Sequence, residues 1–401
     1  MSPATTPAPA AASTNTARNA VACVFALNGF CFATLASRIP DLRASLDLSN
    51  GALGVLLLTV AAGAMVGMPM AGPLTERYGA GTVVRLGALA DLAGLVVTGV
   101  FATVGQPFGA AVGLFCYGLG AGSWDVAMNV EGAVVERMAG RSIMPRFHAG
   151  WSLGTFMGAG VGALAAALGV PLVLHYSLVP ALAVGTALVV SRALPSGTGP
   201  EEDTPATSGE SAWLEPRTLA IGFMVLAFTL AEGAANDWLA LGLVDGYGAR
   251  HWVGVLGFAL FVASMTFGRL VGPVALDRFG RAPTLLASAL AAFVGVLVVV
   301  EVGLAPVAVV GIVLWGLGSA LGFPVGMSAA GDDPLRAARR VSVVSTIGYG
   351  AFLAGPPLLG FVGNQVGTLD SLLVVAAAMV PASLLVFSVR QPRPRPSRSS
   401  A

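Results

Sequence analysis

Long apolar segments recur along the whole chain, and they constrain its fold more than any other feature. A helix needs about 20 apolar residues to cross the hydrocarbon core of a bilayer. Charged residues and Pro/Gly clusters separate the segments, so the sequence predicts twelve membrane-spanning helices. They lie at about 20–38, 51–73, 82–103, 108–134, 145–168, 171–192, 218–244, 252–275, 283–303, 306–329, 342–365 and 370–389.

The composition supports this prediction and excludes other classes of protein. The chain is 56% hydrophobic and only 10% charged, whereas a soluble domain carries about 25% charged residues. This excludes an ordinary cytosolic enzyme and a disordered or secreted scaffold. The net charge of +1 gives no field that would recruit nucleic acid. The three cysteines and three histidines form no CxxC or HExxH pattern, so we expect no disulfide framework, metal or cofactor.

Polar stretches predict the domain boundaries. Residues 1–17 are Pro, Ala, Ser and Thr, and they predict a disordered cytoplasmic tail. Residues 195–216 are acidic and rich in Pro, Gly and Ser, which is typical of a flexible linker. The linker separates two six-helix halves at 18–194 and 217–390, and residues 391–401 form a second cytoplasmic tail.

The arginines predict the orientation. With the N-terminus in the cytoplasm, seventeen arginines fall on the inner face and three, Arg38, Arg43 and Arg250, fall outside, while Arg269 lies within a span. The positive-inside rule therefore predicts a multi-pass protein of the bacterial cytoplasmic (inner) membrane, with both termini in the cytoplasm. A cleaved signal peptide is the alternative for the first apolar run. It would need a basic start, and only Arg18 qualifies.

The two halves resemble one another at an offset of about 200 residues, as in many transporters with internal repeats. The segment GMPMAGPLTERYG, at 67–79, matches GRLVGPVALDRFGR, at 268–281. Glycine permits close helix packing, and the acid and Arg can bridge to neighbouring helix ends in one conformational state. The alternative is a solvated turn that only obeys the positive-inside rule. The predicted gating residues in these loops are Gly72, Glu76, Arg77, Gly79, Asp277 and Arg278.

With these paired loops, the chain resembles transporters of the major facilitator superfamily over about residues 18–390, with Glu76 where Asp is commoner. Three further motifs resemble a bacterial branch that includes fucose-permease-like and rhizopine-permease-like proteins. They are Asp125-Val-Ala-Met-Asn129, Phe147-His148-Ala-Gly-Trp151-Ser-Leu-Gly154 and Glu232-Gly-Ala-Ala-Asn-Asp237-Trp238. The resemblance implies an all-α integral membrane fold of two pseudo-symmetric six-helix bundles. It also implies that Glu136 and Arg137 belong to a cytoplasmic gate, and it leaves the role of Glu131 open.

Ionisable side chains inside a membrane cost at least about 2.5–3.5 kcal/mol at mid-helix and usually have a function. Asp125 shares a helix face with Asn129 at i+4, and Glu232 lies near the middle of the seventh apolar segment. We predict proton coupling through Asp125, Glu232 or His148. A structural pairing of Asp125 and a packing role for His148 are the alternatives.

Polar and aromatic side chains near these acids are the candidates for binding a substrate. Arg269 should pair with Asp125 or Glu232, unless it extends to the membrane surface. Trp238 could instead anchor the membrane interface, and Trp151, Trp315 and Tyr349 could serve core packing alone. The candidates are Asn28, Trp124, Asn129, Trp151, Asn236, Asp237, Trp238, Arg269, Trp315 and Tyr349.

These observations predict a secondary transporter, not an enzyme, because no nucleophile, base or metal set converges and no ATP-binding GxxxxGK[ST] motif is present. Its expected partners are a small polar, sugar-like substrate, protons and the lipid bilayer, without nucleic acid, and it is expected to be a monomer. Efflux of drugs or metabolites in exchange for protons is an alternative. A transporter-like receptor that binds a ligand without moving it is another.

Overall fold

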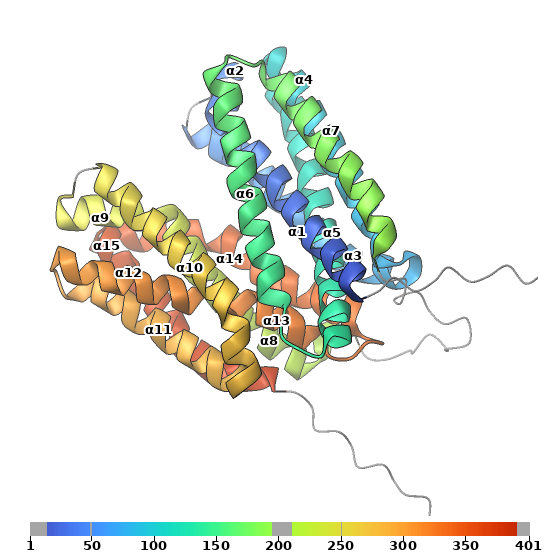
Figure 1. Cartoon of the computed structure of the whole chain (residues 1–401). Coiled ribbons are helices and arrows are strands. Elements are labelled where there is room, and N and C mark those ends of the chain that lie inside the picture. The colour runs from blue at the N-terminus through green and yellow to red at the C-terminus, as the bar shows by residue number, and fades with distance from the viewer. Residues whose placement is uncertain (1–13, 49, 195–210, 250, 391–401) are drawn as a thin grey trace, which may run out of the picture.

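The computed structural model describes residues 14–48, 50–194, 211–249 and 251–390, and these residues form helices joined by short turns, with no strand among them. Seven helices make up the first group (Figure 1). They are α1 (Thr14–Ala36), α2 (Ile39–Ser45), α3 (Asn50–Tyr78), α4 (Ala80–Thr103), α5 (Pro107–Ala139), α6 (Met144–Ala167) and α7 (Leu172–Val190), followed by the 3-10 turn η1 (Ser191–Ala193).

A second group of helices follows residue 210. Its elements are the 3-10 turn η2 (Ala212–Leu214), α8 (Pro216–Ala234), the π-helical turn η3 (Ala235–Leu239), α9 (Ala240–Tyr247), α10 (His251–Phe279), α11 (Arg281–Glu301), α12 (Ala305–Ser319), α13 (Gly322–Ala330), α14 (Ala337–Val366), α15 (Thr368–Ser371), α16 (Leu373–Leu385) and η4 (Val386–Val389). Proline occupies the first turn of α5, α6, α8 and α12, where its missing N–H costs no hydrogen bond.

Ten helical segments of the described chain are long and apolar enough to cross a membrane. They coincide with ten of the twelve predicted apolar segments. The other two predicted segments form α5 and α6, which are not among the ten because of their many glycine and polar residues.

The outer surface of the helices is apolar, as a lipid-facing surface must be. On α7, Leu178 and Leu182 are 66% and 76% exposed, and on α6 Phe156 is 77% exposed. Water would penalise such surfaces, whereas lipid tails accept them and helices satisfy their own backbone hydrogen bonds.

The two groups of helices meet at one end of the molecule and splay apart toward the other (Figure 1). Contacts between the groups run from α3 and α5 to α14, from α6 to α10, and from α5 and α6 to α13. We call the joined end the Arg-rich end, because Arg77, Arg137, Arg217, Arg281 and Arg339 contact their partners there.

The repeated glycine motifs form equivalent sharp turns at this end. Gly79, between α3 and α4, has φ +77°, and Gly280, between α10 and α11, has φ +82°. Only glycine adopts such angles without a steric penalty. The internal repeat predicted from the sequence therefore has the same backbone turn in both groups.

The predicted tails and linker lie mostly outside the described residues, which exclude 1–13, 195–210 and 391–401. Where the chain is described, α1 already begins at Thr14, within the predicted tail. The end of the predicted linker forms η2, and Glu215 accepts hydrogen bonds there from Arg336 and Arg340.

Candidate functional site

A chain of buried hydrogen bonds links α5 to α6. Asn129 donates from its amide nitrogen to the Asp125 carboxylate at 3.3 Å and to the Asp125 backbone carbonyl at 2.9 Å. The side-chain oxygen of Asn129, Oδ1, lies 3.2 Å from His148 Nε2. Asp125, Asn129 and His148 are 5%, 0% and 8% exposed. The i, i+4 spacing thus places an acid, an amide and an imidazole in one connected group.

Aromatic rings from both helix groups surround the imidazole. Phe25 of α1 and Phe323 of α13 contact the His148 ring edge-on, with centroids 5.0 and 5.4 Å away. Phe323 in turn contacts Tyr349 of α14 at 5.8 Å, and Tyr349 interacts with Asp125 and Glu232. Oδ2 of Asp125 is buried and makes no close hydrogen bond, although the Tyr349 hydroxyl faces this carboxylate as a donor. This group can therefore take up a further donor, such as a proton or a substrate hydroxyl.

Arg269, on α10, forms a second buried cluster. Its guanidinium donates to Glu232 of α8 at 2.9 Å, to the Ser152 hydroxyl of α6 at 3.0 Å and to the Ala320 carbonyl at 3.4 Å. The side chains of Arg269 and Glu232 are 4% and 15% exposed. Glu232, rather than Asp125, is the acid that neutralises Arg269. The Ser152 contact joins the two helix groups at this depth.

Three more of the predicted residues border these clusters. The Trp151 indole donates to Asn28 of α1 at 2.9 Å, and Phe32 packs on the Trp151 ring at 5.5 Å. Tyr349 lies between Phe323 and Phe352. Tyr349 therefore joins the His148 cluster through Phe323, whereas Trp151 and Asn28 pack together within the first helix group.

Other predicted binding residues lie elsewhere. Trp124 is fully buried beside Gly87 of α4. Trp315 donates to the Ala231 carbonyl at 3.1 Å and packs on Phe261, which is the packing role left open by the sequence. Trp238 is half-buried against Gly360 of α14.

The π-helical turn η3 carries the remaining candidates. Asn236 and Asp237 are both exposed on it, one turn beyond Glu232 toward the end opposite the Arg-rich end. A π turn inserts an extra residue into a helix and is often found at functional sites. Here Ala235 and Leu239 are buried, whereas Asn236 and Asp237 are exposed.

Glu136 and Arg137 join the two helix groups at the Arg-rich end. Glu136 accepts from the backbone N–H groups of Ile143 and Met144 at 2.8 and 2.7 Å, so it caps the start of α6. Across the interface it accepts from the Ser328 hydroxyl and lies 3.7 Å from Arg281.

Arg137 donates to the Gly331 carbonyl of the opposite group. The predicted loop residues add three contacts between the groups. Glu76 pairs with Arg339 of α14 at 2.7 Å, and Asp277 accepts from the Ser142 N–H at 2.9 Å. Gly72 lies so close to α14 that an added Cβ would stand 2.9 Å from Ser342 Cβ.

Arg77 and Arg278, by contrast, stack over the neighbouring rings of Tyr78 and Phe279. Each therefore contacts a residue of its own helix group rather than bridging to the opposite group.

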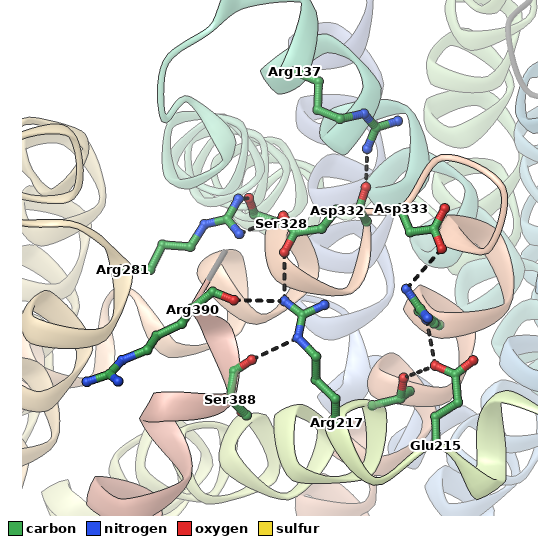
Figure 2. A network of polar contacts seen from close by, with 12 residues as sticks. Arg137, Glu215, Arg217, Arg281, Ser328, Asp332, Asp333, Ser388 and Arg390 are labelled. Atoms are coloured by element: carbon green, nitrogen blue, oxygen red, sulfur yellow. Dashed lines mark hydrogen bonds and ion pairs between the residues drawn. The ribbon is translucent and has the colours of Figure 1, made fainter. Parts of the chain in front are cut away.

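The sequence prediction missed a polar network next to these contacts, which Figure 2 shows. Asp332 holds Arg281 and Arg217 with one oxygen each, both at 2.7 Å. Glu215 binds Arg336 at 2.5 Å and Arg340 at 2.6 Å. Burial acts to raise the pKa of the Glu215 carboxyl, but the hydrogen bonds from Arg340 and Thr218 and the charges of Arg340 and Arg336 outweigh it and lower that pKa.

Two signals in the sequence could have indicated the missed residues. Arg281 ends the repeated loop motif, and the acidic pair Asp332-Asp333 interrupts the apolar pattern between two predicted spans. Ser152, Phe323 and Ser328 carry no such signal, because a hydroxyl or an aromatic ring within an apolar segment is common. Among the described residues, no group of three His, Cys, Asp or Glu side chains is placed to hold a metal ion.

Comparisons with known proteins fit this arrangement. The family model of the Major Facilitator Superfamily matches residues 21–334. An uncharacterized MFS-type transporter of Yersinia pestis is 32% identical over 352 residues, covering 85% of this chain and 87% of that protein. An uncharacterized transporter of Sinorhizobium fredii, y4wD, is 34% identical over 349 residues, covering 86% and 90%. The crystal structure of the MFS transporter FucP in its outward conformation matches with a TM-score of 0.77 at 15% identity, covering 93% of this chain and 98% of that one.

Proposed function

This chain belongs to the major facilitator superfamily of membrane transporters, and we propose that it carries a small polar, sugar-like molecule across the bacterial cytoplasmic membrane by proton-coupled alternating access. Twelve spans in two six-helix halves, 18–194 and 217–390, with both termini in the cytoplasm, are part of the proposal. The Arg-rich end is then the cytoplasmic end.

The observation that carries the proposal is the pair of buried polar clusters between the helix groups. Burying Asp125, Glu232 and Arg269 in a membrane is costly, and packing alone does not require it. Asp125 has one oxygen without a close hydrogen bond and reaches His148 through Asn129. A proton on Asp125 would convert that oxygen from an acceptor into a donor and so alter the hydrogen bonds offered to a substrate.

The contacts at the two ends support alternating access. Several ion pairs and hydrogen bonds join the groups at the Arg-rich end, whereas the groups splay apart at the opposite end (Figure 1). We propose that this is the outward-facing state. Movement to the inward-facing state would break the contacts of Glu76, Glu136 and Arg137 and bring the opposite ends together.

Sugar transport is favoured over an organic anion by the charges near the site. Asp125 and Glu232 outnumber the single Arg269, whose charge Glu232 already neutralises. The polar groups are interleaved with aromatic faces at Trp151 and Tyr349, an arrangement suited to hydroxyl-bearing rings. The xylose symporter XylE and fucose symporter FucP are among its structural neighbours, but at 15% identity or less they show the fold alone.

The test uses purified protein in liposomes with a pH dye inside. Sugars, sugar acids and drugs are added outside, one at a time. Acidification of the interior on addition of a sugar supports the proposed symport. Alkalinisation with a drug would overturn it in favour of proton-coupled efflux. Binding of a compound without its uptake, measured with the same compound radiolabelled, would instead indicate a receptor.

A further inference from the structure

The turn that follows α13 contains an acid that links several segments at the Arg-rich end. Asp332 is 12% exposed, and both of its oxygens are used: Oδ1 accepts from Arg281 and Oδ2 from Arg217, each at 2.7 Å (Figure 2). One carboxylate therefore fixes two long cationic side chains, which would otherwise sample many rotamers.

Arg281 is the member of this set that reaches the other helix group. It donates to the Ser328 hydroxyl at 2.7 Å and lies 3.7 Å from Glu136. Ser328 itself donates to Glu136. At 3.7 Å the Arg281–Glu136 attraction depends on where the guanidinium is held. Asp332 holds it there without touching Glu136.

Arg217 connects Asp332 to the chain segment that enters α8 and to the segment that leaves α16. It donates to the backbone carbonyls of Ser388 and Arg390 at 3.0 and 3.3 Å (Figure 2). It also lies two residues after Glu215, which Arg336 and Arg340 hold at the start of α8. The segment entering α8 and the segment leaving α16 are thus both fixed to the turn that carries Asp332.

We propose that Asp332 is a positioning residue of the closed gate, which aims Arg281 at Glu136 and, through Arg217, makes the strength of that closure depend on the chain segments entering α8 and leaving α16. The inference rests on the proposed function, because it takes the joined end to be a gate that opens. Asp332 touches no substrate-binding candidate and acts through Arg281.

The adjacent acid provides a matched control. Asp333 is 41% exposed, and its ion pair with Arg340 is longer, at 3.4 Å. Asp332→Asn and Asp333→Asn remove the same charge one residue apart. In Asp332→Asn, the side-chain amide could accept from only one arginine, and its NH₂ group would face the other.

The experiment measures the distance across the gate by electron-spin resonance. Spin labels are placed at Met138 of α5 and Phe279 of α10, which are 47% and 60% exposed, in a background without native cysteines. We expect one short distance to dominate in the parent protein. Asp332→Asn should raise the ratio of long to short distances about tenfold, as for a typical coupling between sites. Asp333→Asn should leave the ratio within about twofold of the parent.

Arg217→Gln provides a second route if Asp332→Asn does not fold. It should also favour the long distance, and the two changes together should do no more than either alone, because both act on one connection. An unchanged distribution in both variants, or an equal shift in Asp333→Asn, would overturn the inference. The proposed function fails differently, because it predicts a second, long-distance population in the parent protein and substrate-driven proton movement, neither of which requires Asp332.

Discussion

The buried ion pair of Glu232 and Arg269 predicts that each single substitution lowers the unfolding free energy and that the double substitution does not. Such a result would indicate a pair that is retained for function, because the pair as a whole does not add to stability. Replacing Glu232 by Met leaves a guanidinium 4% exposed and without its counter-charge. Breaking such a pair costs about 3–5 kcal/mol of unfolding free energy. Arg269 keeps Ser152 and the Ala320 carbonyl as acceptors, so we expect about 3 kcal/mol.

The expected costs of the second single variant and of the double variant, which complete a double-mutant cycle, follow from the same contacts. Arg269→Met should cost less, about 1–2 kcal/mol, because the Glu232 left behind is 15% exposed whereas Arg269 is 4% exposed. The double variant should lie within about 1 kcal/mol of the parent, since replacing a whole buried pair by apolar groups is often neutral. The coupling energy, which is the sum of the two single costs minus the cost of the double variant, would then be about 3–6 kcal/mol.

The assay is a denaturant titration of the purified protein in detergent, followed by helix content. Asp237→Met serves as the control on the same stretch of helix, because Asp237 is exposed, and it should change stability by less than about 0.5 kcal/mol. A double variant that costs the sum of the two single changes would refute the reasoning. The two side chains would then be stabilised by separate partners.

Three further predictions concern the closed end and the Asp125 cluster. The pKa of Glu215 is lowered in the folded protein, so its contribution to stability is complete above the usual Glu value of about 4.3 and is lost as the pH falls through the lowered value. Glu215→Gln should therefore make the thermal midpoint fall less steeply at acid pH. An unchanged slope would contradict this. Gly72→Leu should force α3 from α14 and expose a cysteine introduced at the Arg-rich end to a thiol reagent, whereas Gly54→Leu, where nothing lies within 4 Å of an added Cβ, should not. Equal labelling of that cysteine in the two variants would refute the prediction. Asn129→Leu leaves Asp125 without its amide donor, a loss of about 1–3 kcal/mol, so substrate-driven proton uptake should fall about tenfold or more. A parental rate would contradict a role of Asn129 in the uptake.

The apolar segments predicted most of the fold because a bilayer leaves few alternatives. A chain that crosses it must satisfy its backbone internally, so segment length and Arg placement carry the information. The helix breaks at η3 and between α12 and α13 were not predicted. No Pro or Gly in η3 marks the first break, whereas Pro324, which has no N–H to donate, follows the second.

The site was predicted in part, for a similar reason. The sequence indicated Asp125, Glu232 and Arg269, because an ionisable side chain in an apolar segment is conspicuous. It did not indicate which acid pairs with Arg269, since that depends on how α8 and α10 pack together. Trp124 illustrates the opposite case: it is adjacent to Asp125 in sequence, but a helix turns neighbouring residues about 100° apart, and it faces α4 instead.

The most direct test of coupled transport compares two kinds of uptake in liposomes, using a radiolabelled sugar that moves protons in the parent protein. One is exchange of labelled for unlabelled sugar, which needs no proton gradient, and the other is accumulation driven by an acidic exterior. We predict that Asp125→Asn keeps exchange and loses accumulation, because the amide can still hydrogen-bond but cannot carry a proton. An Asp125→Asn protein that still concentrates the sugar inside the liposomes would contradict the account.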